Sequence, residues 1–260
     1  MKQADILKSV QEVGGNQFDF DEFYARCWSE KRGGISFKLA NNLINYLKEK
    51  NLAVGSVLDV CSGSGEFISN LRNICTDCVG IDTADGFISY AKRKCSDVEF
   101  IKVDRLHEFN LKRKFDLISC NGDVVNMFTL FDNWKTFFEV VNNHLSKNGL
   151  FLFDFYTKEY LDSLSGLVYD ESENIDYVSK RTQNNGLCVM SEIYYLKESS
   201  MYYRKTGDVM VETSFKIEDI LNLLKATGFI DVKLVGVDLK ELTLDDLKVA
   251  TRIHVLARKK

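Results

Sequence analysis

Between residues 56 and 156 the chain alternates between two hydrophobic patterns. Short apolar runs, typical of buried strands, cover residues 56–61, 78–82, 98–104, 115–121 and 150–156. Between these runs, apolar residues recur at the spacing of amphipathic helices over residues 66–75, 86–94 and 133–145. Strands that alternate with helices predict a parallel sheet covered by helices. The fold class is therefore expected to be α/β.

Two further helices are predicted ahead of the first strand. Residues 18–28 are rich in aromatic side chains and include aspartates that can cap a helix. Residues 37–47 carry a second set of apolar side chains at helical spacing. Residues 1–50 are therefore expected to form an N-terminal helical segment.

After residue 156 the pattern changes to period two. Alternating runs over 177–182, 187–195 and 201–203 are separated by Asn184-Asn185-Gly186 and Thr206-Gly207-Asp208, which predict turns between antiparallel strands. We interpret residues 157–214 as an antiparallel β insertion.

The last part of the chain returns to the first pattern. Helical spacing covers 217–224 and ends at Gly228, a residue type favoured at helix C-caps, and the final strands are predicted at 232–237 and 253–257. Residues 51–156 and 215–260 together are expected to form the α/β core.

Composition narrows the class of protein. With 260 residues, 45% of them hydrophobic, the chain can bury the core of one elaborated domain. The 34 basic and 38 acidic residues give a formal charge of −4, and no basic tail offers a footprint for nucleic acid. No apolar run approaches the length of a membrane span, and residues 1–5 lack a signal-peptide core. We expect a cytoplasmic protein that binds no membrane and no nucleic acid, and a homodimer stays open.

The chain has seven cysteines and three histidines. Cys61, Cys120 and Cys188 lie inside apolar strand patterns, which is typical of small buried side chains in a reducing compartment. Cys75 and Cys78 form a CxxC pair, but no second pair or histidine cluster accompanies it. We expect reduced, buried thiols here and no metal site, with a metal or redox role for the pair as the alternative.

The segment Val57-Leu58-Asp59-Val60-Cys61-Ser62-Gly63-Ser64-Gly65 carries the most specific signal. A buried strand ends in an acid, crosses two glycines and opens into a helix, an arrangement that binds nucleotide-like ligands beyond the strand's carboxyl end. A dinucleotide fits badly, because isoleucine occupies the place of the third glycine in that fingerprint. No Gly-Lys-Ser/Thr follows, so a P-loop is excluded as well.

This turn, followed by a second strand that ends in Gly80-Ile81-Asp82, resembles the class I S-adenosylmethionine-dependent methyltransferases, nearest to the glycine and amino-sugar N-methyltransferases. The resemblance implies a Rossmann-like seven-stranded sheet with helices on both faces. It also implies that the insertion after strand five is a β layer over the acceptor site. The implied cofactor is S-adenosyl-L-methionine, and the product is S-adenosyl-L-homocysteine.

The resemblance assigns cofactor-binding roles along the ends of four strands. Asp59 lies near the sulfonium, and Asp82 accepts hydrogen bonds from the ribose hydroxyls. Their alternatives are a cap for the turn (Asp59) and a cap for the next helix (Asp82). The full expected set is Asp59, Cys61, Gly63, Ser64, Gly65, Asp82, Thr83, Asp104, Arg105, Leu106, Asn121 and Gly122.

The resemblance also suggests residues at the acceptor. Asp123 orients or deprotonates an acceptor amine, or else caps a helix. Tyr156 stands where relatives carry asparagine in Phe-Asp-x-Asn-Thr, and Arg204 belongs to an aromatic-basic run that reaches the substrate. Tyr24, together with Trp28, resembles an N-terminal lid, and aromatic core packing is the alternative.

The leading hypothesis is a methyltransferase that acts on a small molecule, with an amine as the expected acceptor. The chain contains no proline, so it carries neither the Asp/Asn-Pro-Pro-Tyr/Phe motif nor the Pro-Cys nucleophile of two nucleic-acid methyltransferase groups. The alternatives are an RNA- or protein-directed methyltransferase, a cofactor-binding protein without catalysis, and last an NAD-dependent reductase.

Overall fold

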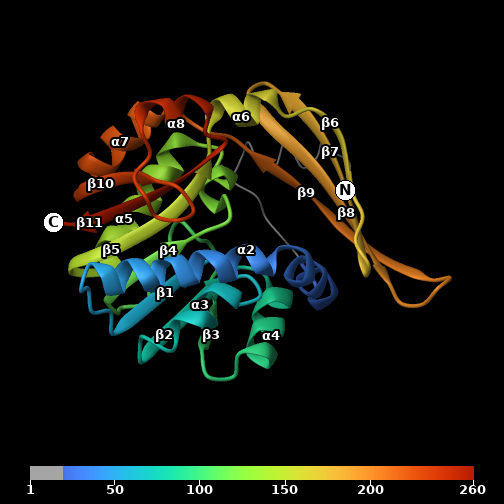
Figure 1. Cartoon of the computed structure of the whole chain (residues 1–260), viewed down its shortest axis with the longest axis horizontal. Helices are drawn as coiled ribbons and strands as arrows, with labels where there is room; N and C mark the ends of the chain where they lie inside the picture. The colour runs from blue at the N-terminus through green and yellow to red at the C-terminus, as the bar shows by residue number, and fades with distance from the viewer. Residues whose placement is uncertain (1–19) are drawn as a thin grey trace.

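The computed structural model describes residues 20–260, which form a seven-stranded sheet with a second, four-stranded sheet beside it (Figure 1). The strand order in the large sheet is β10-β11-β5-β4-β1-β2-β3, and β11 runs antiparallel to both of its neighbours. This is the sheet of the class I methyltransferase fold, so the predicted fold class is confirmed. Its strands are β1 (Ser56–Val60), β2 (Asp77–Asp82), β3 (Glu99–Lys102), β4 (Phe115–Cys120), β5 (Leu145–Tyr156), β10 (Phe229–Val235) and β11 (Arg252–Lys259).

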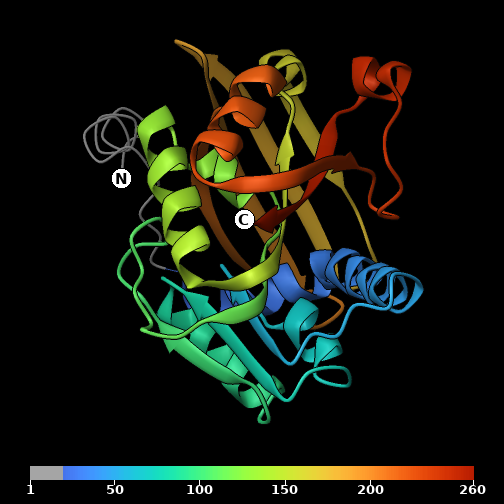
Figure 2. The same ribbon diagram turned by 90° about the vertical axis from the view of Figure 1, so that its left-hand side faces the viewer.

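Helices cover both faces of the large sheet (Figure 2). Leu43 and Ile68 pack with Leu117 in the core of one face, while Trp134 packs with Phe151 in the core of the other. Each fully buried side chain of this size stabilises the fold by about 1.5–3 kcal/mol. The first face is covered by α2 (Glu22–Glu49), α3 (Glu66–Leu71) and α4 (Asp85–Lys94), the second by α5 (Phe131–His144) and α7 (Ile217–Ala226).

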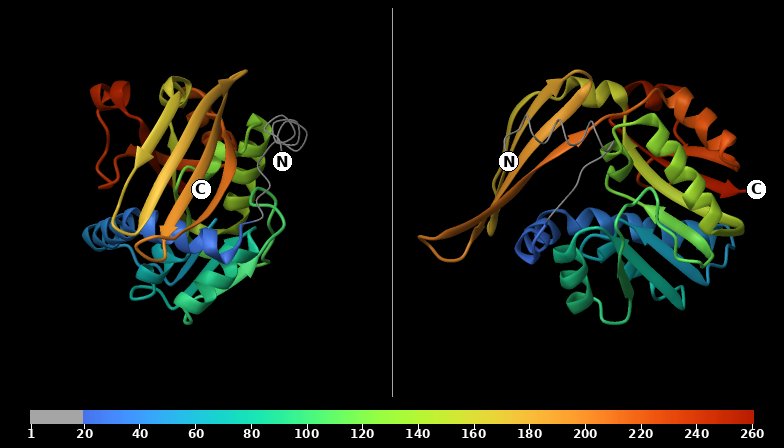
Figure 3. Two further views of the ribbon diagram at one scale, coloured as in Figure 1. Left: turned by 90° about the vertical axis from the view of Figure 1, so that its right-hand side faces the viewer. Right: turned by 180° about the vertical axis from the view of Figure 1, so that it is seen from behind.

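The insertion forms a separate antiparallel sheet in the order β6-β7-β8-β9 (Figure 3). It leaves the core after Tyr156, at the carboxyl end of β5, and returns beside the carboxyl end of β4, where the Thr213 amide donates to the Asn126 carbonyl at 2.9 Å. The insertion therefore lies against the edge of the large sheet where the parallel strands end. Its elements are α6 (Lys158–Ser163), β6 (Gly166–Asp170), β7 (Ile175–Asn184), β8 (Leu187–Lys197) and β9 (Tyr203–Glu212). Two short elements complete the fold, the 3₁₀ helix η1 (Val124–Met127) and the helix α8 (Leu244–Val249).

The prediction of two helices ahead of β1 is wrong, because α2 is one continuous helix. Asp21 caps it by accepting a hydrogen bond from the Tyr24 amide at 2.7 Å. Gly33, in the middle, lets the Glu66 side chain pack closely, since a Cβ there would lie 3.1 Å from that side chain. Residues 18 and 19 of the first predicted helix, and the signal-peptide expectation at residues 1–5, lie outside the described residues.

The predicted turn at Thr206-Gly207-Asp208 is also wrong, because β9 runs straight through it. A Cβ at Gly207 would lie 2.2 Å from the Glu192 carbonyl oxygen, so glycine is needed here for close approach to β8 rather than for a turn. Sequence patterns also missed β6, α6 and α8, which are short and mostly exposed.

The expectation of reduced thiols at the CxxC pair is wrong, because Cys75 and Cys78 are joined by a disulfide between α3 and β2. Their Cα atoms are 6.6 Å apart, within the range that a disulfide spans. The other cysteines of the described part are free thiols, and Cys27, Cys95, Cys120 and Cys188 are buried.

Within residues 20–260, none of the helices is both long enough and apolar enough to cross a lipid bilayer.

Candidate active site

The glycine turn after β1 has the backbone that its sequence predicts. Cys61, Gly63 and Gly65 have positive φ angles of 57°, 52° and 83°. A Cβ at Gly65 would lie 2.8 Å from the Phe100 ring, so a larger residue would be both strained and overcrowded. The Ser62 amide donates to the Ile81 carbonyl at 2.9 Å and fixes the turn against the end of β2.

Asp82 holds this turn directly. One carboxylate oxygen accepts from the Gly63 amide at 3.0 Å, and the other accepts from the Ala84 amide at 3.0 Å. The side chain is buried, and burial raises the pKa of Asp82 although these backbone donors oppose the rise. Asp82 is not the N-cap of α4, because Ala84 occupies that position.

Asp59, one residue before the end of β1, is paired in the sheet with Gly80, two residues before Asp82. Its carboxylate is buried and accepts from the Ser119 hydroxyl at 2.6 Å. Burial raises the pKa of Asp59 to about 7, against the Ser119 hydrogen bond, and the charge of Asp82 adds to the rise. Two neighbouring carboxyls beneath the turn favour a ligand that brings positive charge.

Several polar groups around the turn have no partner among residues 20–260. The Ser62 hydroxyl and both amide atoms of Asn121 are buried without a hydrogen bond. No atom of the described residues lies within 4 Å of the place where a Cβ on Gly122 would be. Because buried polar groups are nearly always satisfied, these atoms are available to a polar ligand at the ends of β1 and β4.

The other predicted cofactor residues lie along the same edge. Ser64 is buried and donates to Glu66 at 2.5 Å, and Thr83 is half-buried after β2. Leu106 is buried beyond β3, whereas Asp104 and Arg105 are exposed, and Arg105 pairs with Glu108 at 3.4 Å. The Val103 amide donates to the Asp82 carbonyl at 2.9 Å, which keeps the end of β3 beside the end of β2.

A second cluster lies at the ends of β4 and β5, beside the insertion. Arg252 on β11 donates to both Asp123 and Asp154, and its guanidinium lies 4.1 Å from the centre of the Tyr156 ring. Asp154 also accepts from the Gly122 amide at 2.6 Å. Asp123 starts η1 with a left-handed backbone and makes no side-chain cap, so its carboxylate faces Arg252 instead. This geometry favours the orienting role over helix capping.

Glu212, the last residue of β9, completes this cluster and was missed, as were Asp154 and Arg252. It is fully buried, and burial followed by the charge of Asp123 raises the pKa of Glu212 well above its usual range. The sequence contains a signal for Glu212. Residues two apart in a strand face the same side, and Met210 faces inward, so Glu212 faces inward as well. A charged residue at a core-facing strand position is uncommon without a function.

The two predicted lid residues differ. Tyr24 is buried in an aromatic cluster, stacked on Phe20 at 4.1 Å and edge-on to Tyr194 at 5.5 Å, which corresponds to the packing alternative. Trp28 is half-buried, and its ring would lie 3.7 Å from a Cβ on Gly63. Only Trp28 of this pair therefore borders the glycine turn directly.

The structure places Arg204 away from the other predicted acceptor residues. Its side chain is exposed, and the guanidinium stacks 4.0 Å from the centre of the Phe23 ring at the start of α2. Arg204 and Glu212 lie on the same extended strand, eight residues apart, which corresponds to about 26 Å. Arg204 therefore joins the insertion to α2 and does not face Asp123.

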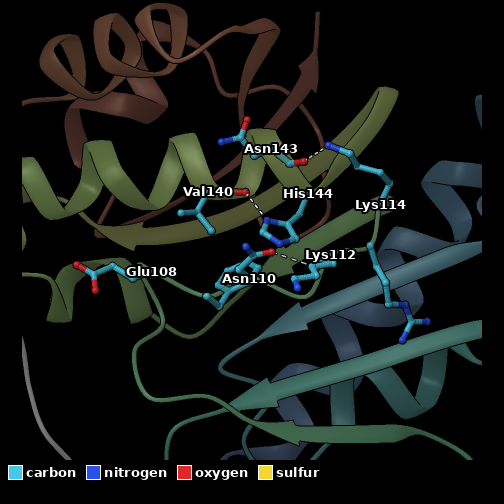
Figure 4. Close-up of a pocket in the computed structure, with 9 residues that line it drawn as sticks. Glu108, Asn110, Lys112, Lys114, Val140, Asn143 and His144 are labelled. Atoms are coloured by element: carbon cyan, nitrogen blue, oxygen red, sulfur yellow. Dashed lines mark hydrogen bonds between the residues drawn. The ribbon is translucent and has the colours of Figure 1, made fainter.

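A pocket of about 500 Å³ between the β3–β4 loop and α5 lies elsewhere (Figure 4). Its polar groups serve the fold. The His144 ring bonds the Val140 carbonyl at 2.7 Å and accepts from the Leu111 amide at 3.1 Å, while Arg113 pairs with Asp77 at 2.6 Å. This pocket borders the start of β4, whereas the glycine turn lies at the other end of the parallel strands. Within residues 20–260, no group of three or more potential ligands could hold a metal ion.

The fold and the glycine turn together define an α/β transferase of the class I methyltransferase type. A family model described as a methyltransferase domain matches residues 35–234, and the chain therefore belongs to this family.

Solved structures agree with this fold. A S-adenosylmethionine-dependent methyltransferase from Clostridium acetobutylicum ATCC 824 superposes with a TM-score of 0.77 at 23% identity, over 85% of this chain and 91% of that chain. KedS8, a sugar N-methyltransferase from Streptoalloteichus sp ATCC 53650, gives 0.74 at 18% identity, over 95% of each chain. CalS10, an amino pentose methyltransferase from Micromonospora echinaspora that was solved with S-adenosylmethionine bound, gives 0.72 at 17% identity, over 94% of this chain and 99% of that chain. At these identities the likeness establishes the fold alone.

Proposed function

We propose that the protein is an S-adenosylmethionine-dependent methyltransferase whose acceptor is a small molecule with an amino group. The observation that supports the amine is the carboxyl-rich cluster of Asp123, Asp154 and Glu212 at the end of β4, covered by the insertion. The sugar N-methyltransferase activity in the name of KedS8 agrees with this choice.

The glycine turn fits the proposed cofactor. The unpartnered Ser62 hydroxyl and Asn121 amide offer both donors and acceptors for its amino-acid part. Asp82 would accept from the ribose hydroxyls, and Asp104 and Leu106 would border the adenine beyond β3. The other residues of the proposed cofactor site are Asp59, Cys61, Gly63, Ser64, Gly65, Thr83, Arg105 and Gly122. When bound, S-adenosylmethionine supplies a methyl group that is already activated by its sulfonium, so the protein mainly has to provide position and a dry site.

The chain's own residues would prepare the acceptor. A protonated amine has no free electron pair, so a proton has to leave before the nitrogen can attack a methyl group. The Asp123 carboxylate, which accepts a hydrogen bond from Arg252, would accept that proton. The Tyr156 ring lies beside Arg252 as an aromatic wall, and the insertion, bonded to η1 through Thr213 and Asn126, would help to exclude water from the ends of β4 and β5.

A small acceptor is favoured over RNA by charge. Buried carboxyls at the proposed acceptor position would repel phosphates, and the whole chain has a formal charge of −4.

The test has two stages. Calorimetry should show binding of S-adenosylmethionine and S-adenosylhomocysteine to the full chain. Mass spectrometry of a panel of amino sugars and other small amines, each paired with its hydroxyl counterpart, should then show transfer of a methyl group to amines only. Absence of cofactor binding, or equal methylation of the hydroxyl counterparts, would contradict the proposal.

A further inference from the structure

Glu212 is a buried acid without a donor. Its side chain is 0% exposed, and neither carboxylate oxygen accepts a hydrogen bond from any residue of 20–260. A buried charge without a partner costs several kcal/mol, and a buried acceptor usually has a donor. The fold therefore carries an unsatisfied group at the end of β9, beside η1.

Two of the neighbouring charged groups already have hydrogen-bond partners. Arg252 directs its guanidinium to Asp123 and Asp154. Glu192, on β8, is also buried, but it accepts hydrogen bonds from the hydroxyls of Tyr177 and Tyr194. Glu212 thus differs from Glu192 in having no donor, although both glutamates lie on the inward face of the same sheet.

The polar group that faces Glu212 is another carboxyl. Asp123 lies close enough that its charge, after burial, raises the pKa of Glu212, and a protonated Glu212 can donate a hydrogen bond to Asp123. Arg252 donates to Asp154 and to Asp123, but not to Glu212. The cluster of Asp123, Asp154, Glu212 and Arg252 therefore contains three carboxyls and one guanidinium.

We propose that Glu212 and Asp123 together form the binding site for the acceptor's amino group in its cationic, ammonium form. An alkylammonium brings one positive charge and up to three N–H donors, which matches a carboxyl-rich cluster in which the Glu212 oxygens have no donor. A hydroxyl of the same shape brings no charge and a single donor. Glu212 is therefore a residue that selects amines over alcohols.

The same pair can remove the proton that blocks methylation. One N–H bond of the bound ammonium breaks, its electron pair stays on nitrogen, and the proton forms an O–H bond on Asp123. No oxidant or reductant is involved. Glu212 acts here by positioning the ammonium against Asp123. This inference rests on the proposed function, because the group bound here is taken to be the one that is methylated.

The test uses ethylammonium chloride as the probe and ethanol as its uncharged counterpart. Thermal unfolding of the full chain is followed against probe concentration at constant ionic strength, with and without S-adenosylhomocysteine, for the wild type, Glu212→Gln and the matched control Glu192→Gln. We expect saturable stabilisation of the wild type and of Glu192→Gln by ethylammonium, none by ethanol, and at least tenfold weaker ethylammonium binding to Glu212→Gln.

A second measurement observes the wild type directly. Carbon NMR of the wild type labelled at the glutamate carboxyls should show a saturable shift of one buried resonance on addition of ethylammonium. That resonance should be missing from the spectrum of Glu212→Gln or, if this variant does not fold, from the spectrum of Glu212→Asp.

The proposal is overturned if no glutamate resonance moves and no stabilisation occurs in either series, or if Glu212→Gln binds ethylammonium as tightly as the wild type. Ethylammonium binding without methylation of any amine would contradict the proposed function and leave this site standing. Methylation of amines with an unchanged KM in Glu212→Gln would contradict this inference and leave the proposed function standing.

Discussion

Replacing Asp59 by asparagine should change the pH dependence of stability in a defined way. The Asp59 carboxyl is 3% exposed, and its hydrogen-bond donor is the Ser119 hydroxyl at 2.6 Å. Burial raises its pKa from 3.8 to about 7 in the folded protein. An asparagine has nearly the same shape and can still accept from Ser119, but it does not ionise.

The sign follows from proton binding. Below the unfolded pKa of 3.8 both states are protonated, and Asp59 has no effect on the pH dependence. Between 3.8 and about 7 the folded protein holds a proton that the unfolded chain has lost, so the free energy of unfolding falls as pH rises. Above about 7 both states are ionised, and the loss is complete. A pKa difference of about 3 corresponds to ~4 kcal/mol.

Asp59→Asn should remove this loss. Burying the amide NH₂ without an acceptor costs about 1–3 kcal/mol, so at pH 8 the variant should be more stable than the wild type by ~2 kcal/mol. At pH 4.5 it should be no more stable than the wild type. Ser119→Ala is the control, because removing the hydrogen bond that lowers the pKa of Asp59 should extend the falling range above pH 7.

The measurement is urea unfolding followed by circular dichroism at pH 4.5, 6 and 8. Parallel curves of unfolding free energy against pH for the wild type and Asp59→Asn would refute the reasoning.

Three other substitutions test the site and the fold. Asp82→Ala should weaken S-adenosylmethionine binding at least tenfold, because it removes the group that fixes the Gly63 amide and is placed for the ribose; unchanged affinity in calorimetry would remove the assignment. Tyr24→Phe should have the kcat of the wild type, whereas Tyr24→Ala should lower the free energy of unfolding by ~3–5 kcal/mol, as expected for a buried packing residue. A large loss of kcat in Tyr24→Phe would restore a catalytic role for the hydroxyl. In urea unfolding, Gly207→Ala should lower the free energy of unfolding by ~3 kcal/mol, because its Cβ would lie 2.2 Å from the backbone of β8. Gly34→Ala, which has open space around it in α2, should raise the free energy of unfolding by about 0.5–1 kcal/mol. Equal effects of the two substitutions would show that the close approach at Gly207 does not limit stability.

The sequence predicted the features that neighbouring residues decide. Parallel central strands are buried on both faces, so they read as continuous apolar runs, and β1, β2 and β4 could be placed to within a residue or two. The turn at Gly63 and Gly65 was recognisable because its acid, glycines and following helix are adjacent in the chain. Asp82 could be paired with that turn because strand ends of a parallel sheet meet at one edge.

Patterns of single residues failed where a distant contact decides the conformation. Gly33 does not interrupt α2, because Glu66 packs against the space that the glycine leaves. Gly207 signals a turn by type but serves the contact of β9 with β8. Cys75 and Cys78 gave no sign from composition that they would be joined.

The methyltransferase core and its cofactor edge follow from the amino-acid sequence alone, because strand ends, glycine turns and helix starts depend on adjacent residues. The proposed acceptor side follows from the tertiary structure. Glu212, Asp123 and Arg252 come from three segments that the insertion and the last strand bring together, whereas the extended strand β9 holds Arg204 about 26 Å from Glu212. Charge interactions act through space and not along the chain. The register of the strands therefore decides which carboxyls lack a partner, and this register is set jointly by side chains that are far apart in the sequence.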